Sequence, residues 1–104
     1  NHVGEAAKEF PSLFFLATEA CTGEMPWSRG PKIGEFSRAM MYARDIVSDM
    51  NNMAVGWTDW NLLLDHQGGP NHAKNWVDAP MIVSEDKKTV YKQPMYYAMG
   101  HFAK

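Results

Sequence analysis

The stretch that decides the fold is LFFLATEACTG, residues 13–23. Its residues from Leu13 to Thr18 are mostly apolar, and the run ends at a carboxylate, Glu19, that small residues and a glycine follow. A strand buried on both faces of a parallel sheet has this pattern, and ligands of such sheets gather at the carboxyl ends of the strands. We therefore expect a strand that places Glu19 at the mouth of a sheet or barrel. A carboxylate that is only the first solvated residue after a strand, or a helix cap, fits the local sequence equally well.

The residues that follow predict a βαβ unit. Between residues 34 and 51, apolar residues recur three and four positions apart, which predicts an amphipathic helix covering a sheet. The apolar stripe consists of Ile33, Phe36, Met40, Ala43, Val47 and Met50. Residues 53–61 then predict a second strand, parallel to the first. Side chains alternate along a strand, so Asp59 is expected to face away from Trp60.

Shorter elements flank this unit. Residues 3–10 predict a helix that Pro11 ends, and the two prolines and the glycine of residues 24–31 predict an irregular loop that holds Trp27, as a cleft wall or as a lid. Residues 81–83 and 89–91 predict a hairpin. Pro94 opens a last helix, whose apolar stripe is formed by Met95, Met99 and Phe102.

Two parallel strands leave both edges of a sheet unpaired, so we expect residues 1–104 to be a piece of a larger α/β domain. A barrel of eight βα units needs about 250 residues, and the chain has 104. The predicted elements amount to about the last quarter of such a barrel.

Composition and charge narrow the classes of function. A net charge of -2 gives no electrostatic reason to expect nucleic acid, and no apolar stretch is as long as a transmembrane helix. One cysteine, Cys21, cannot form an internal disulfide, and no histidine is placed by sequence to make it a nucleophile. The four histidines lack the spacing of a metal site, and no phosphate-binding loop predicts a cofactor. Tryptophans beside Gly, Asn and Asp suit a carbohydrate cleft, although packing is the commoner use of any one aromatic residue.

Four motifs in order carry a resemblance to a known family. They are FLATEAC at residues 15–21, VGWTDWN at 55–61, GGPN at 68–71, and YKQPMYY at 91–97, which continues to GHF at 100–102. Together they resemble the glucosylceramidases, which are acid β-glucosidases among the retaining glycoside hydrolases. The resemblance implies that residues 1–104 are a fragment of the catalytic (β/α)8 TIM-barrel domain, covering about strands 7 and 8 with their helices.

The same resemblance implies roles for particular residues. Glu19 is implied as the catalytic nucleophile, Trp60 and Asn75 as substrate-binding residues that line the sugar subsite, and Trp27 as part of the loop that edges the cleft. Cys21 is implied as a free thiol near the site. The family's acid/base glutamate follows the fourth strand, which places it outside this chain, so no acid/base is named here and the fragment alone is predicted to be inactive. His72 departs from the family, which often has a tryptophan there.

For the parent protein, the resemblance implies hydrolysis of glucosylceramide or a related β-glucoside in sphingolipid catabolism. It further implies a lipid surface and an activator protein as partners, and a lysosomal or secreted location. A non-catalytic carbohydrate-binding or scaffold relative is the alternative. Glu19 discriminates between the two, because a binding protein needs no attacking carboxylate there.

Overall fold

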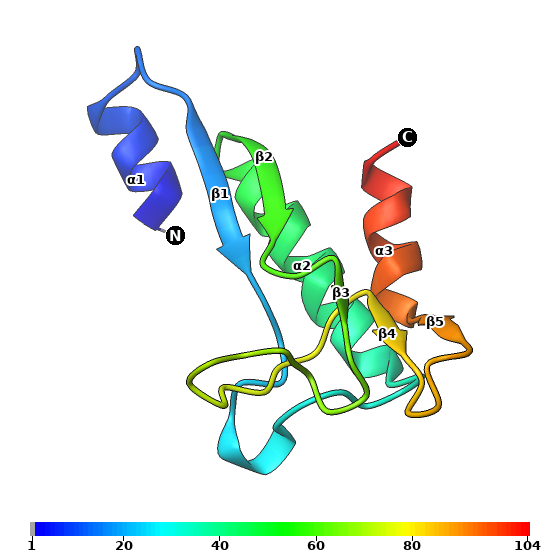
Figure 1. The fold of residues 1–104 in the computed structure, drawn as a ribbon. Helices are drawn as coiled ribbons and strands as arrows, with labels where there is room; N and C mark the ends of the chain where they lie inside the picture. The colour runs from blue at the N-terminus through cyan, green and yellow to red at the C-terminus, as the bar shows by residue number, and fades with distance from the viewer. Residues whose placement is uncertain (1) are drawn as a thin grey trace.

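A computed structural model describes residues 2–104, which form two small sheets and three α-helices along a body of 50 × 31 × 21 Å (Figure 1). The helices are α1 (His2–Glu9), α2 (Phe36–Asn51) and α3 (Pro94–Phe102), and a short 3-10 helix, η1, spans Pro26–Ser28. The strands are β1 (Phe15–Ala20), β2 (Ala54–Asp59), β3 (Leu63–Leu64), β4 (Met81–Val83) and β5 (Val90–Lys92). None of the helices within residues 2–104 is long and apolar enough to cross a membrane.

The predicted βαβ unit is confirmed. Strands β1 and β2 pair in parallel and α2 connects them, so their carboxyl ends lie at the same edge of the sheet. Within the described residues this sheet has two strands only, and each has one unpaired edge. The predicted boundaries of β1 were early by two residues at both ends, because the strand begins at Phe15 and continues through Glu19 to Ala20. Glu19 therefore lies inside the end of the strand rather than after it.

The predicted apolar stripe of α2 is wrong in the described chain. The buried residues of this helix are Arg38, Ala39, Tyr42 and Ile46, whereas Phe36 is 66% exposed and Met40 is exposed as well. Tyr42 packs edge-on against Trp57 of β2, with ring centroids 5.1 Å apart, and Ala39 and Tyr42 share a core cluster with Met95 of α3. Strand β2 and helix α3 both pack against the side of α2 that carries Ala39 and Tyr42. That face is therefore buried, and the more apolar predicted face is exposed.

The second sheet has the order β3-β4-β5, and it confirms the predicted hairpin of β4 and β5. Strand β3 pairs in parallel with β4 over two residues, which is too short for a sequence pattern to predict. The predicted helix at Pro94 is confirmed, although its stripe is buried only at Met95, while Met99 is partly buried and Phe102 is 47% exposed. The predicted N-terminal helix is confirmed as α1. The loop at residues 24–31 contains one turn of helix, η1, with Pro26 at its first position.

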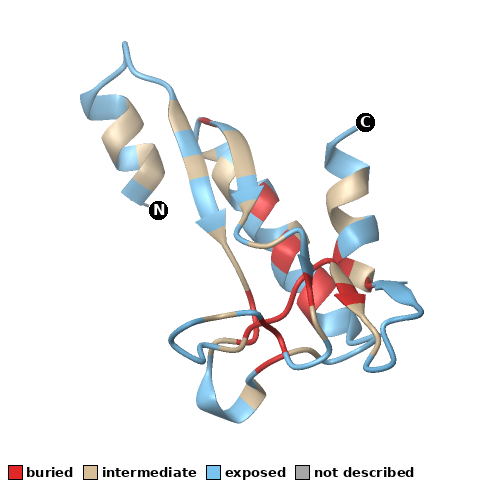
Figure 2. Cartoon of the chain, in the orientation of Figure 1, coloured by how far each residue is buried: buried red, intermediate tan, exposed pale blue. Residues whose placement is uncertain are grey.

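Buried residues gather where α2, α3 and the long loops meet, as Figure 2 shows, whereas α1 and most of β1 are exposed or half-buried. One cluster consists of Leu64, Val77, Ala79 and Ile82, with Cys21 packed against it. The loop between β3 and β4 thus belongs to the core, and the strand that carries Glu19 lies beside it.

Candidate active site

The carboxyl ends of β1 and β2 form the candidate site. The Trp60 backbone N–H donates to the Ala20 carbonyl oxygen at 2.8 Å, so the backbone beside Glu19 is tied to the backbone of Trp60. Both strand arrows in Figure 1 point to the end of the molecule where the loop that follows β1 and the loop between β3 and β4 gather. The sheet thus presents Glu19 and Trp60 toward these two loops.

An irregularity in β1 sets the register at Glu19. Ala17 pairs with Trp57 and Ala20 pairs with Asp59, so two residues of β1, Thr18 and Glu19, oppose the single residue Thr58 of β2. Such a bulge interrupts the regular alternation of side chains and re-aims them, and bulges occur often beside active sites. Thr18 and Glu19 are both exposed. Local propensity gives no signal for this bulge.

A hollow of about 590 Å³ borders this strand end. Its lining includes Glu19, Cys21, Tyr42 and Trp57, together with residues of α2. Cys21 has no disulfide partner within residues 2–104. Burial raises the pKa of its thiol, and the carboxylates of Glu24, Asp59 and Glu19 raise it further. The thiol is therefore held neutral, which disfavours a role as an attacking thiolate.

Asp59 lies at the end of β2 on the side of α2, where Trp57 Nε1 donates to the Asp45 carboxylate at 2.8 Å. Burial raises the pKa of the Asp59 carboxyl to about 6, although the Tyr42 hydroxyl and the backbone N–H groups of Asn61 and Trp60 act to lower it. Asp59 Oδ1 accepts from the Asn61 N–H at 3.2 Å. Within residues 2–104, Oδ2 of Asp59 and the Tyr42 hydroxyl are buried without a hydrogen bond of regular geometry. The Asp59 carboxyl thus lies beside Tyr42 of α2.

The other residues implied by the resemblance lie on separate segments. Trp60 follows β2 and is 57% exposed, and Trp27 lies on η1 and is 79% exposed. Asn75 is exposed on the loop between β3 and β4, where its backbone N–H donates to Asn71 Oδ1 at 3.2 Å. Among residues 2–104, no hydrogen bond or ring contact joins these side chains to one another or to Glu19. Trp60 lies close to Glu19 because its backbone N–H bonds to the neighbouring Ala20 carbonyl oxygen. Trp27 lies on the loop that follows β1, and Asn75 lies on the loop between β3 and β4.

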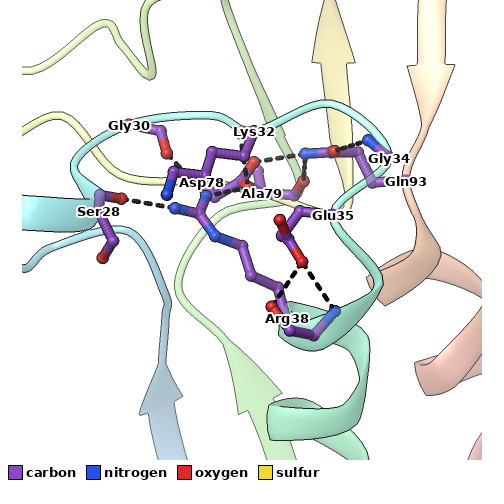
Figure 3. Close-up of polar contacts among 10 residues, drawn as sticks. Ser28, Gly30, Lys32, Gly34, Glu35, Arg38, Asp78, Ala79 and Gln93 are labelled. Carbon is purple, nitrogen blue, oxygen red and sulfur yellow. Dashed lines mark hydrogen bonds and ion pairs between the residues drawn. The ribbon is translucent and has the colours of Figure 1, made fainter.

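A buried polar network links these loops, and sequence reasoning missed it (Figure 3). The Arg38 guanidinium forms an ion pair with the Asp78 carboxylate, and the two side chains are almost fully buried. Gln93, which is 2% exposed, donates to the Asp78 carboxylate and accepts from the Gly34 N–H at 3.2 Å. The signals for it were weak: an arginine one helical turn before Tyr42, an acid between Val77 and Ala79, and a glutamine that could equally have been solvated.

Among residues 2–104, no three His, Cys, Asp or Glu side chains are grouped as metal ligands. The four histidines are exposed, and His2 Nδ1 lies 3.3 Å from the Glu5 carboxylate.

Comparison with known proteins shows which family this chain belongs to. The sequence pattern of the glycosyl hydrolase family 30 TIM-barrel domain matches residues 1–104. The chain belongs to glycosyl hydrolase family 30. The resemblance to glucosylceramidases that the four motifs carry is thereby confirmed, and the βαβ unit is a part of the family 30 TIM barrel.

Two curated relatives of this family 30 chain are informative. The nematode Caenorhabditis elegans has a protein named "Putative glucosylceramidase 4" that is 51% identical over 100 residues, covering 96% of this chain and 19% of the relative. The mouse (Mus musculus) lysosomal acid glucosylceramidase is 43% identical over 102 residues, covering 98% of this chain and 20% of the relative. The chain therefore spans about a fifth of the length of these relatives.

Solved structures of barrel enzymes superpose on nearly the whole chain. SrfJ from Salmonella typhimurium matches with a TM-score of 0.82 and 27% identity over 96% of this chain and 22% of its own. An endo-β-1,6-glucanase matches with a TM-score of 0.77 and 24% identity over 96% of this chain and 22% of its own, a likeness that shows the fold alone. The second neighbour is named for a glucan rather than a glucolipid, so the shared fold does not determine the substrate.

Proposed function

We propose that the protein containing this chain is a retaining β-glucosidase that hydrolyses glucosylceramide or a related β-glucoside, with Glu19 as its nucleophile. The observation that carries the proposal is the position of Glu19. It is an exposed carboxylate in a bulge at the carboxyl end of β1, beside the strand end that bears Trp60, in a chain of family 30. Catalytic residues of TIM barrels come from strand ends of this kind.

The chemistry follows from a pair of carboxyl groups. In a retaining glycosidase an ionised carboxylate attacks the anomeric carbon and forms a covalent glycosyl-enzyme, while a protonated carboxyl about 5 to 5.5 Å away donates to the leaving oxygen; water then releases the sugar. Glu19 takes the first role. The acid/base lies outside residues 1–104, so we expect the chain alone to be inactive.

Three further side chains are proposed to bind the substrate. Trp60 offers an aromatic face to the apolar side of the glucose ring, and Asn75 can both donate to and accept from its hydroxyl groups. Trp27, the middle residue of η1, edges the cleft. The bulge at Thr18 and Glu19 interrupts the alternation of side chains in β1, and Glu19 is exposed at the strand end beside Trp60.

We further propose that β1 and β2 are the seventh and eighth strands of the barrel. Their unpaired edges fit two neighbouring strands of a barrel, which supplies a neighbour on each side, and the numbers seven and eight are those that the family resemblance implies. Residues 1–104 are then one fragment of the catalytic domain.

The substrate and location proposed for the whole protein rest on the named relatives. Glucosylceramide as substrate, a role in sphingolipid catabolism and a lysosomal or secreted location are supported by the lysosomal mouse glucosylceramidase at 43% identity. A lipid surface, with an activator protein that presents the lipid, belongs to the same proposal.

The decisive experiment is covalent labelling of the whole protein with a cyclophellitol-type β-glucoside inhibitor, followed by mass spectrometry of its peptides. The expected label lies on Glu19, and Glu19→Gln abolishes it. The matched control is Glu85→Gln, because Glu85 lies exposed in the hairpin turn between β4 and β5 and should leave labelling unchanged. A folded protein with no label on Glu19, which still binds glucosides, would favour the carbohydrate-binding alternative.

A further inference from the structure

The loops that carry Trp27 and Asn75 meet around one buried ion pair. The first loop, residues 21–35, follows β1 and contains η1, and the second, residues 65–80, connects β3 to β4. The Asp78 backbone N–H donates to the Thr22 carbonyl oxygen at 2.8 Å, which joins the two loops through their backbones. Neither loop is held by a sheet at this point, and the side chains of Arg38 and Asp78 add further contacts between them.

Arg38 holds the first loop directly behind Trp27. Its guanidinium donates to the Gly30 carbonyl oxygen at 2.7 Å and to the Ser28 carbonyl oxygen at 2.5 Å. Ser28 is the residue next to Trp27. Because the guanidinium is planar and rigid, these donations fix the loop relative to the first turn of α2.

Asp78 anchors the second loop to the same point. Its carboxylate pairs with Arg38, accepts from the Lys32 N–H at 3.2 Å and from the Ala79 N–H at 2.9 Å, and also accepts from the Gln93 side chain. The side chain has no exposed surface. Asp78 lies three residues after Asn75, so the carboxylate ties the chain that bears Asn75 to the segment that follows Trp27.

The backbone of the first loop is built closely around this pair. Gly23 has a φ of +86°, and a Cβ there would lie 2.9 Å from both the Asp78 nitrogen and the Gly30 carbonyl oxygen and 3.2 Å from Arg38 Nη1. Only glycine fits both the conformation and the space. A buried ion pair is weak evidence for stability, since an apolar pair of similar size is often as stable. What the ion pair supplies here is a fixed arrangement of the two loops.

We propose that Arg38 and Asp78 are positioning residues whose buried ion pair locks the Trp27 loop to the Asn75 loop, so that the two side chains contact one β-glucoside together. This inference rests on the proposed function of the Glu19 site. This ion pair of Arg38 and Asp78, the clamp, touches no substrate. Its effect is on how well the two loops are ordered before the substrate binds.

The test uses the whole protein and two variants. Arg38→Lys keeps the charge but cannot span two carbonyl oxygens and a carboxylate, and the double variant Arg38→Met with Asp78→Leu removes both charges, so that neither is left buried alone. We expect KM for a β-glucoside to rise about tenfold, with kcat changed less than about twofold, because ground-state and transition-state binding are lost together. Ile46→Val is the control: it trims the buried face of α2 away from the loops, so it should lower the melting temperature without moving KM.

Hydrogen exchange provides a readout that does not depend on activity. In the Arg38→Lys variant, amides of residues 22–34 and of residues 71–80 are expected to exchange about tenfold faster together, while those of β4 stay unchanged. Faster exchange in one loop alone, or folded variants with an unaltered KM, would overturn the clamp. Absence of the inhibitor label on Glu19 in the unsubstituted protein would instead overturn the proposed function, and the exchange experiment would still decide whether the loops are coupled.

Discussion

The loop end of the molecule, where Arg38 pairs with Asp78, and the β1–β2 sheet differ in how far the described residues complete their contacts. At the loop end, Arg38, Asp78 and Gln93 are buried and hydrogen-bonded to one another and to loop backbone. In the β1–β2 sheet and just before it, large apolar side chains are exposed, including Phe14 at 78% and Val55 at 65%. The contacts of the loop end are therefore complete within the described residues, whereas the β1–β2 sheet has the open edges and apolar faces of a larger barrel.

The largest expected effect concerns Glu19 at the carboxyl end of β1, and it separates a chemical role from a structural one. Glu19→Gln in the whole protein should lower kcat for an aryl β-glucoside about 10³-fold or more, because an amide cannot form the glycosyl-enzyme. Since Glu19 is exposed, the free energy of unfolding should change little. Steady-state kinetics and urea unfolding measure the two quantities. Substantial hydrolysis by the purified variant would exclude Glu19 as the nucleophile.

The next effect tests the loop end. Asp78→Ala leaves the Arg38 guanidinium buried without its partner, which should destabilise the protein by about 3 to 5 kcal/mol. Asp86→Ala is the matched control, because Asp86 is exposed in the turn between β4 and β5 and its loss should cost less than about 1 kcal/mol. Chemical unfolding of both variants measures the difference. Equal losses would mean that the loop end does not depend on the ion pair.

A third substitution examines whether an exposed face of the β1–β2 sheet is covered in the whole barrel. Leu16 is 49% exposed in this chain and lies against Gly56 of β2. If the remaining strands close over this face, Leu16→Ala in the whole protein should cost about 2 to 3 kcal/mol, as a buried leucine does. A loss below about 0.5 kcal/mol in urea unfolding would show that this face stays open to solvent.

The smallest expected effect concerns pH. Burial raises the pKa of Asp59 to about 6 in the folded protein, so the folded state keeps a proton that the unfolded chain releases near pH 4. The stabilising contribution of the protonated carboxyl is therefore present at pH 4 and is lost as the pH rises toward and through 6. Because Asp59 is partly exposed, the loss should be on the order of 1 kcal/mol.

Asp59→Asn should remove this dependence, which urea unfolding between pH 4 and 7 can measure. The charged and titratable groups near Asp59 are Tyr42 on α2, Asp78 on the second loop and Cys21 after β1. Tyr42 and Cys21 have raised pKa values and stay neutral in this range. An unchanged slope in the variant would assign the pH dependence to another group.

Most of the secondary structure could be predicted from the sequence because its signals are local. The run into Glu19, the turn between β4 and β5, and Pro94 at the start of α3 each act within a few residues. The buried face of α2 could not be predicted in this way, because it depends on β2 and α3. The Arg38–Asp78 pair joins residues 40 positions apart, and no local pattern marks either partner. The roles of Glu19, Trp60, Asn75 and Trp27 came from the family resemblance, and they remain proposals.

The extra residue in β1 also controls which acids become neighbours. If the pairing of Ala17 with Trp57 continued without interruption, Glu19 would lie directly opposite Asp59. Two carboxyl groups facing each other across a sheet would have to share protons, and the ionisation of each would depend on the other. The bulge places Ala20 opposite Asp59 instead. One inserted residue thus acts as an electrostatic spacer, because Asp59 can take up its proton with no second carboxyl group directly opposite.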